Sequence, residues 1–165
     1  MLEANLVLRN YYHVECIRNG KKIWEEFIKN LIVTEGLNDV LEQYFLGVAY
    51  TADWWVGLVD NLGFTQFVAG DTLALHAGWD EFTTYTGDRK ALVLGAVAAA
   101  SVDNSASKAS YTIGVGGGTV HGAFLCTAET GVVGTIYGEG AFSAPRSVNE
   151  LDVLNVTITL TSASS

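Results

Sequence analysis

The residues that most directly suggest chemistry are four carboxylates in one short stretch, Asp71, Asp80, Glu81 and Asp88. Paired carboxylates perform acid/base catalysis, and glycoside hydrolysis needs two of them roughly 5–10 Å apart across a cleft. Oxygen clusters also bind calcium, but the D-x-D-x-D-G pattern of a calcium loop is missing. Because side chains alternate along a strand, Asp80 and Glu81 are expected on opposite faces. Solvated loop and edge charges therefore explain these residues better than a carbohydrate hydrolase built on Asp71, Asp80 or Glu81.

The other residue types that support catalysis or ligand binding lack the required spacing. His13, His76 and His121 lie far apart, and none belongs to a metal-binding pair, so we expect satisfied or exposed histidines. The glycine-rich run 114–118 lacks the Lys-Ser/Thr ending and the following helix of a phosphate loop, which favours a hairpin turn. No serine lies in a Gly-x-Ser-x-Gly elbow. The sequence thus predicts a protein that is not an enzyme and holds no metal or cofactor.

Aromatic residues suggest a binding function of a different class. Trp54, Trp55, Trp79 and Phe82 have the side chains that line sugar-binding grooves, although packing in a β-sandwich core explains them more simply. A receptor- or glycan-binding module stays open as an alternative hypothesis. It requires Trp54, Trp79 and Tyr85 to be exposed.

The composition describes one globular domain with an acidic surface. Of the 165 residues, 49% are hydrophobic, which suffices for a sizeable core, and the net charge is −9. This charge argues against a nucleic-acid partner, because phosphate contacts need clustered Lys or Arg. Residues 1–30 hold five basic and four acidic side chains (net +1), whereas residues 31–165 hold four and fourteen (net −10). The front segment either meets different surroundings and serves as a grip, or the surface charge is simply uneven.

Targeting and redox features predict a protein kept in a cytosol, at least until it is assembled into something. The N-terminus lacks the layout of a signal peptide, and no apolar stretch reaches the roughly 20 residues of a membrane span. Cys16 and Cys126 are interpreted as small buried hydrophobes. A disulfide between them stays open as an alternative.

One amphipathic helix next to a buried strand is the element around which the fold is expected to form. Apolar residues recur at helical spacing and are predicted to face the core, namely Leu37, Val40, Leu41, Tyr44 and Phe45. Thr34 is placed to cap the first amides, and Gly47 to end the helix in a left-handed conformation. The apolar run 54–59 is typical of a strand covered on both faces, and the helix stripe is expected to cover one of them.

The rest of the chain predicts short antiparallel strands in a sandwich or barrel, and thus an all-β protein with one helix. Asn19-Gly20 favours a two-residue turn, so residues 1–30 are interpreted as an N-terminal β-hairpin arm and residues 31–165 as the β-sandwich domain. The alternative is a hairpin that joins the main sheets. Further strands are expected at residues 64–68, 79–86, the first half of 90–100, 109–115, 120–127, 131–137 and 152–161.

Six segments carry a resemblance that covers most of the chain. They are NLIVTEGLND (30–39), YTADWWVGLV (50–59), DTLALHAGWDE (71–81), SVDNSASKA (101–109), GEGAFS (138–143) and LNVTITL (154–160). In order and spacing they resemble a family of small tailed-bacteriophage virion proteins that decorate or cement the capsid. These segments carry no catalytic pattern.

The resemblance implies a jelly-roll-like β-sandwich that binds the outside of the major capsid protein lattice, as a homodimer or homotrimer. Such a protein sits on the virion surface after assembly in the host cytoplasm, without nucleic-acid or membrane partners. A head-fibre or tail-associated receptor-binding module is the alternative. Tyr11, Tyr12, Trp24 and Phe27 of the front hairpin are the candidate interface residues, because Tyr and Trp are common interface anchors. The alternative place for these side chains is the core.

Overall fold

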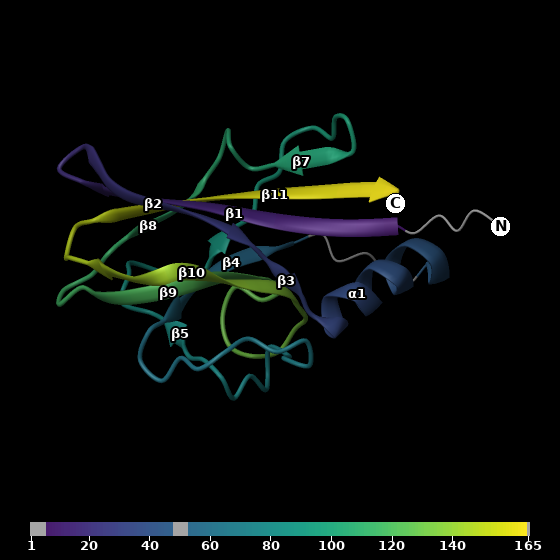
Figure 1. Cartoon of the computed structure of the whole chain (residues 1–165), viewed down its shortest axis with the longest axis horizontal. Coiled ribbons are helices and arrows are strands. Elements are labelled where there is room, and N and C mark those ends of the chain that lie inside the picture. The colour runs from purple at the N-terminus through teal and green to yellow at the C-terminus, as the bar shows by residue number, and fades with distance from the viewer. Residues whose placement is uncertain (1–5, 48–52, 165) are drawn as a thin grey trace.

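The computed structural model describes residues 6–47 and 53–164, which form two antiparallel β-sheets packed face to face (Figure 1). Sheet A has the strand order β2-β1-β11-β7, and β8 also pairs with β11. Its strands are β1 (Leu6–Arg18), β2 (Lys21–Lys29), β7 (Ser101–Asp103), β8 (Ala109–Thr112) and β11 (Val153–Ser164). Sheet B has the order β3-β10-β9-β4-β5, and β6 also pairs with β4. Its strands are β3 (Leu31–Ile32), β4 (Trp55–Asp60), β5 (Glu81–Phe82), β6 (Lys90–Ala91), β9 (Gly118–Cys126) and β10 (Ile136–Val148).

These sheets confirm the expected all-β fold with one helix, in the form of an antiparallel β-sandwich, while the jelly-roll arrangement stays a prediction. The core lies between the sheets and is filled by alternate side chains of the long strands. On β11, Leu154, Val156 and Ile158 are fully buried, which confirms the alternation predicted for residues 152–161. Cys16 and Cys126 are buried free thiols, so their interpretation as small hydrophobes is confirmed and no disulfide joins them.

The N-terminal hairpin is present, but it does not project as an arm. Asn19 (φ 50°) and Gly20 (φ 75°) form the predicted turn, since both residues adopt positive φ. Strand β1 pairs with β11 from Leu6 to Ile17, so the hairpin is an integral part of sheet A. Residues 1–30 are therefore not a unit apart from residues 31–165, because both contribute strands to sheet A. The physical reason is that alternate β1 residues are apolar and need sheet B to cover them.

The helix begins and ends close to the predicted positions, but its start is not capped by Thr34. α1 (Thr34–Leu41) continues into a single π-helical turn, η1 (Glu42–Leu46), and ends at Gly47 with φ 66°, as expected. The N-cap is Val33, which has no side-chain cap. Instead, the Thr34 amide donates to the carbonyl of Ala69 at 2.8 Å. Within the described residues, no helix is long and apolar enough to cross a membrane.

The prediction that the apolar stripe of this helix faces the core is wrong. The helix packs on β10 rather than covering β4, and its closest approach is at Gly36, where an added Cβ would collide with the Tyr137 backbone. Because the contact is made by the smallest residue, the large apolar side chains point away from the sandwich. Tyr44 is 81% exposed, Phe45 66% and Leu41 53%. Of the predicted stripe, only Val40 packs against the core.

Several predicted strands differ in length or position. Residues 64–68 form no strand, and the expected strands at 79–86 and 90–95 shrink to β5 and β6. The strand expected at 131–137 begins only at Ile136 and runs on to Val148 as β10. The strand was not predicted beyond residue 137 because glycines usually weaken a strand. Here they are required by close packing, since a Cβ on Gly138 would collide with Asn30 and one on Gly140 with Ile28. The 114–118 turn is present, but it leads from sheet A to sheet B instead of closing a hairpin.

Candidate functional site

The four predicted interface residues separate into two exposed and two inward-facing side chains. Tyr11 is 38% exposed and Phe27 is 74% exposed, both on the outer face of sheet A. Tyr12 is only 1% exposed, and its hydroxyl donates to the carbonyl of Gly138 at 3.1 Å. Trp24 is half-buried against the core. Only Tyr11 and Phe27 are therefore available to a partner.

Tyr11 and Phe27 border a shallow groove of about 610 Å³ on the outer face of sheet A, which we call the sheet A groove. Its other lining residues with solvent contact are the exposed Lys29 and Ser105 and the half-buried His13, Asp103, Thr157 and Thr159. The register explains the arrangement, because Tyr11 lies opposite both Lys29 and Thr159, and Thr159 lies opposite Asp103. The groove thus combines aromatic rings with hydroxyl, carboxylate and ammonium groups.

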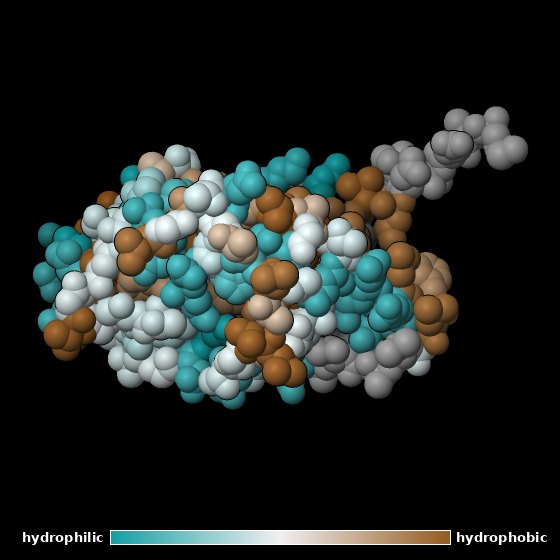
Figure 2. All heavy atoms as spheres, turned by 90° about the horizontal axis from the view of Figure 1, so that it is seen from below, coloured by the Kyte–Doolittle hydropathy of each residue, from teal (hydrophilic) through white to brown (hydrophobic). Residues whose placement is uncertain are grey.

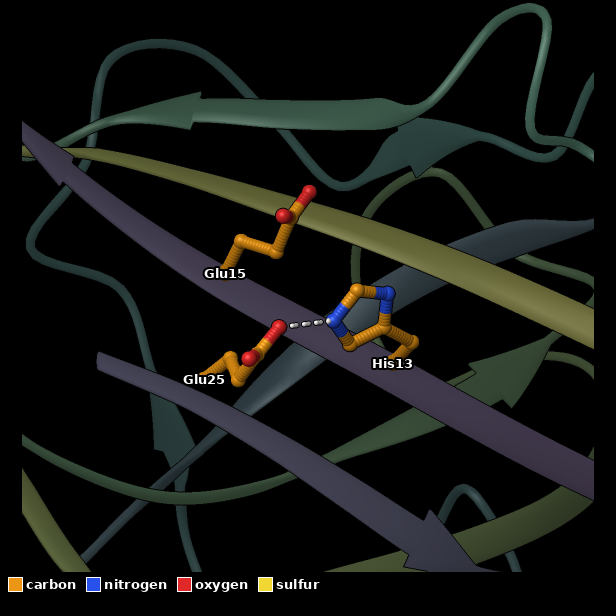
Figure 3. Close-up of side chains that lie close together, drawn as sticks. All are labelled: His13, Glu15 and Glu25. Carbon is orange, nitrogen blue, oxygen red and sulfur yellow. Dashed lines mark hydrogen bonds and ion pairs between the residues drawn. The ribbon is translucent and has the colours of Figure 1, made fainter. Parts of the chain in front are cut away.

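At the rim of the groove, His13 lies between an aromatic ring and an acid (Figure 3). Its ring stacks flat on Phe27, with 4.2 Å between centroids and 2° between planes. Its Nε2 lies 2.9 Å from Oε2 of Glu25, and Glu15 projects from the same face of β1. A hydrogen bond from Lys108 is the main reason why the pKa of Glu15 is lowered, and a hydrogen bond from Lys22 does the same to Glu25.

A second exposed surface, the helix surface, consists of the large apolar side chains that point away from the sandwich. Its residues are Leu37, Leu41, Tyr44, Phe45 and Leu46. Figure 2 shows apolar side chains gathered at the end of the molecule that α1 occupies in Figure 1. Beside the helix, an apolar hollow of about 220 Å³ is lined by residues that include Val40, Trp54 and Leu94.

The carboxylates considered for hydrolysis lie in different environments. Glu81 accepts two hydrogen bonds from Arg89, at 2.9 and 2.7 Å, and lines a surface hollow of about 190 Å³. Asp71 is buried, where it accepts hydrogen bonds from the Trp79 indole at 3.3 Å and the Val68 amide at 3.1 Å. These two acids are therefore held by structural partners. Asp80 is exposed.

Sequence reasoning missed a buried carboxyl group next to Asp71. Glu139 of β10 is fully buried, and this burial, followed by the effect of the neighbouring Asp71 carboxylate, raises its pKa to about 9. Neither of its oxygens has a hydrogen-bond partner among the described residues, and an unpaired buried carboxyl group costs less free energy when neutral than when charged. The only signal in the sequence was a glutamate between two glycines, Gly138 and Gly140.

Trp54, Trp79 and Tyr85, which the receptor-binding hypothesis requires to be exposed, do not form an exposed surface. Trp79 is buried, while Trp54 and Tyr85 are half-buried and pack against the core. The histidines outside the groove are satisfied, as expected. His76 stacks on Trp79, and His121 Nδ1 donates a hydrogen bond to Asn61 Oδ1 at 2.9 Å.

Comparison with known proteins adds no family assignment. No family model matches the sequence, and no curated protein matches it.

Proposed function

We propose that this chain is a virion structural protein that binds the outside of a major capsid protein lattice and stabilises it, as a cement or decoration protein. In this proposal the sandwich is jelly-roll-like and forms a homodimer or homotrimer. It reaches the virion surface after assembly in the host cytoplasm.

The observation that carries the proposal is the helix surface. Its large apolar side chains are in contact with water, which costs free energy unless a partner covers them. Tyr44 and Phe45 add aromatic rings, which are enriched in protein interfaces. The net charge of −9 favours solubility at the high copy number that a shell-coating protein needs.

The sheet A groove supports a second contact at a different place. Tyr11 and Phe27 lie on the outer face of sheet A, whereas the helix surface lies at one end of the sandwich. Two separate exposed surfaces suit a protein that touches both the shell and a neighbouring copy of itself. Binding to assembled shells but not to free subunits stabilises the shell by mass action.

The test uses shells assembled from the cognate major capsid protein without this chain. Wild-type protein is expected to bind at saturable stoichiometry and to raise the temperature at which the shells disrupt. Phe45→Asp is expected to weaken binding at least about tenfold, because it places a charge in the apolar contact. The measurements are co-sedimentation and differential scanning fluorimetry of the shells.

Val133→Asp is the matched control, since Val133 is an exposed apolar residue at 90% exposure outside both surfaces. It is expected to bind shells like the wild type. Failure of the wild-type protein to bind the shells contradicts the proposal. Equal loss of binding in Phe45→Asp and Val133→Asp contradicts the role of the helix surface.

A glycan-binding virion module is the second candidate function, and the sheet A groove is the observation that favours it. Exposed aromatic rings stack on sugar faces, and Asp103, Ser105 and Thr159 offer hydrogen-bonding groups beside Tyr11 and Phe27. This site differs from the tryptophans first considered for the role.

A glycan array of bacterial surface oligosaccharides tests this candidate. If it is correct, a hit bound by the wild type loses at least about tenfold in affinity in Phe27→Ala and keeps its affinity in the matched variant Tyr44→Ala. No hit on the array, or equal loss in both variants, counts against the glycan function.

A further inference from the structure

Three metal-ligating side chains meet on the outer face of sheet A. His13 and Glu15 are two residues apart on β1, so they project from the same face, and Glu25 of β2 lies directly opposite Glu15. Figure 3 shows Glu25 of β2 pointing at the His13 ring, with Glu15 beside them on β1. All three belong to a continuous sheet whose other face packs in the core, so their backbones are held in place.

The distances between the ligand atoms suit one small metal ion. One nitrogen of His13 and one oxygen each of Glu15 and Glu25 lie within 4.8 Å of one another, and His13 Nε2 is 2.9 Å from Glu25 Oε2. Ligands of tetrahedral zinc lie about 2.0–2.2 Å from the ion, so two of them are about 3.3 Å apart. Rotation of the glutamate side chains covers the difference.

The His13 ring is oriented before any ion arrives. Flat stacking on Phe27 holds the imidazole plane, and this orientation directs Nε2 toward Glu25. Such an arrangement lowers the cost of ordering the ligand. The three side chains are 27%, 16% and 37% exposed in the order His13, Glu15 and Glu25, so the ion has access from solvent.

Two lysines form ion pairs with these glutamates. Lys108 Nζ lies 2.7 Å from Glu15, and Lys22 Nζ lies 2.7 Å from Glu25 and 3.6 Å from Glu15. Such partly exposed ion pairs contribute little to stability, so the lysines hold the glutamates only weakly.

We propose that His13, Glu15 and Glu25 bind a divalent transition-metal ion of the zinc type, which displaces Lys22 and Lys108 from the glutamates. The imidazole ligand selects such an ion over calcium or magnesium, which prefer oxygen ligands alone. Three protein ligands leave the fourth position open to water or to a group of a bound partner. The site is independent of the proposed capsid function.

Isothermal titration of the untagged full-length protein with ZnCl₂ tests the site, and visible absorption of the Co²⁺ form reports the ligand set. One equivalent is expected to bind the wild type. His13→Ala and Glu25→Gln are expected to weaken binding at least about tenfold, because each removes one ligand. Circular dichroism checks that each variant is folded.

The lysines provide the test that separates a metal site from a cluster of ion pairs. Lys108→Gln is expected to tighten zinc binding several-fold, because it removes a competitor for Glu15. His121→Gln, a change of a histidine outside the cluster, is expected to leave the affinity unchanged. The proposal is overturned by the absence of saturable binding, by wild-type affinity in folded His13→Ala, or by weaker binding in Lys108→Gln.

Discussion

Glu26 of β2 forms an ion pair with Arg146 of β10 and so ties the edge of sheet A to sheet B. The guanidinium Nε lies 2.7 Å from Oε1 of Glu26, and the amide and hydroxyl of Ser143 donate to the same carboxylate at 3.2 and 3.0 Å. Burial acts to raise the pKa of Glu26, but the hydrogen bonds from Arg146 and Ser143 outweigh it and hold the pKa below its usual value. The ionised carboxylate therefore stabilises the contact between the sheets.

Replacement of this carboxylate is expected to destabilise the fold in a pH-dependent way. Glu26→Gln should lower the free energy of unfolding at pH 7 by about 2 kcal/mol, because Arg146 loses its charged partner. Since the folded pKa is lowered, the stabilisation is present above the ordinary value of 4.5 and is lost as the pH falls through the folded pKa. Urea unfolding at pH 7 and pH 3 measures the difference, which should shrink at low pH. Glu150→Gln, at an exposed position, is the control.

Glu139 is expected to make the protein less stable as the pH rises. Its pKa is raised from 4.5 to about 9, so between these values the folded state binds more protons than the unfolded state. The free energy of unfolding should then fall by up to about 1.4 kcal/mol per pH unit in this window. Glu139→Gln keeps a neutral hydrogen-bond donor and should flatten this dependence. Urea unfolding at pH 6 and pH 8.5 provides the measurement, and parallel curves for both proteins contradict the buried neutral carboxyl.

The close approach of α1 to β10 depends on Gly36. A Cβ at this position would collide with the Tyr137 backbone, so Gly36→Ala is expected to lower the free energy of unfolding by about 1–3 kcal/mol. This is the opposite of the gain of up to about 1 kcal/mol that alanine usually gives within a helix. Gly70→Ala is the matched control, because nothing lies within 4 Å of its added Cβ. A stabilised Gly36→Ala variant contradicts the packing of the helix.

The part of the fold that could be predicted from the sequence is the part set by local patterns. The alternation of apolar and polar residues correctly predicted which side chains of β11 face the core, and Asn19-Gly20 correctly predicted the turn. Both features depend on residues that are close in the chain. The side to which the apolar stripe of the helix points is set by a tertiary contact, the packing of Gly36 on the Tyr137 backbone. A helical period shows which residues share a face, but the packing of the whole helix decides whether that face is covered.

The candidate site was harder to predict, because its register contains an irregularity. A two-residue turn at Asn19-Gly20 without a bulge pairs Glu15 with Trp24. The structure has a register shift at Cys16/Ile17, after which Glu15 lies opposite Glu25 and Trp24 turns inward. The bulge thus brings Glu25 and Phe27 to the same outer face as His13. No residue type marks it in the sequence, so the His13, Glu15 and Glu25 cluster was missed.

The exposure of the helix surface leads to a prediction that separates a docking surface from a core. Phe45→Ser is expected to change the free energy of unfolding by no more than about 0.5 kcal/mol, because Phe45 is already 66% exposed and loses few contacts. Phe124→Ala, in the buried core, should cost about 3–5 kcal/mol. Urea unfolding of both variants provides the comparison. A cost for Phe45→Ser close to that of Phe124→Ala would mean that α1 and η1 pack their apolar side inward, and the proposed contact with the capsid would then lose its main support.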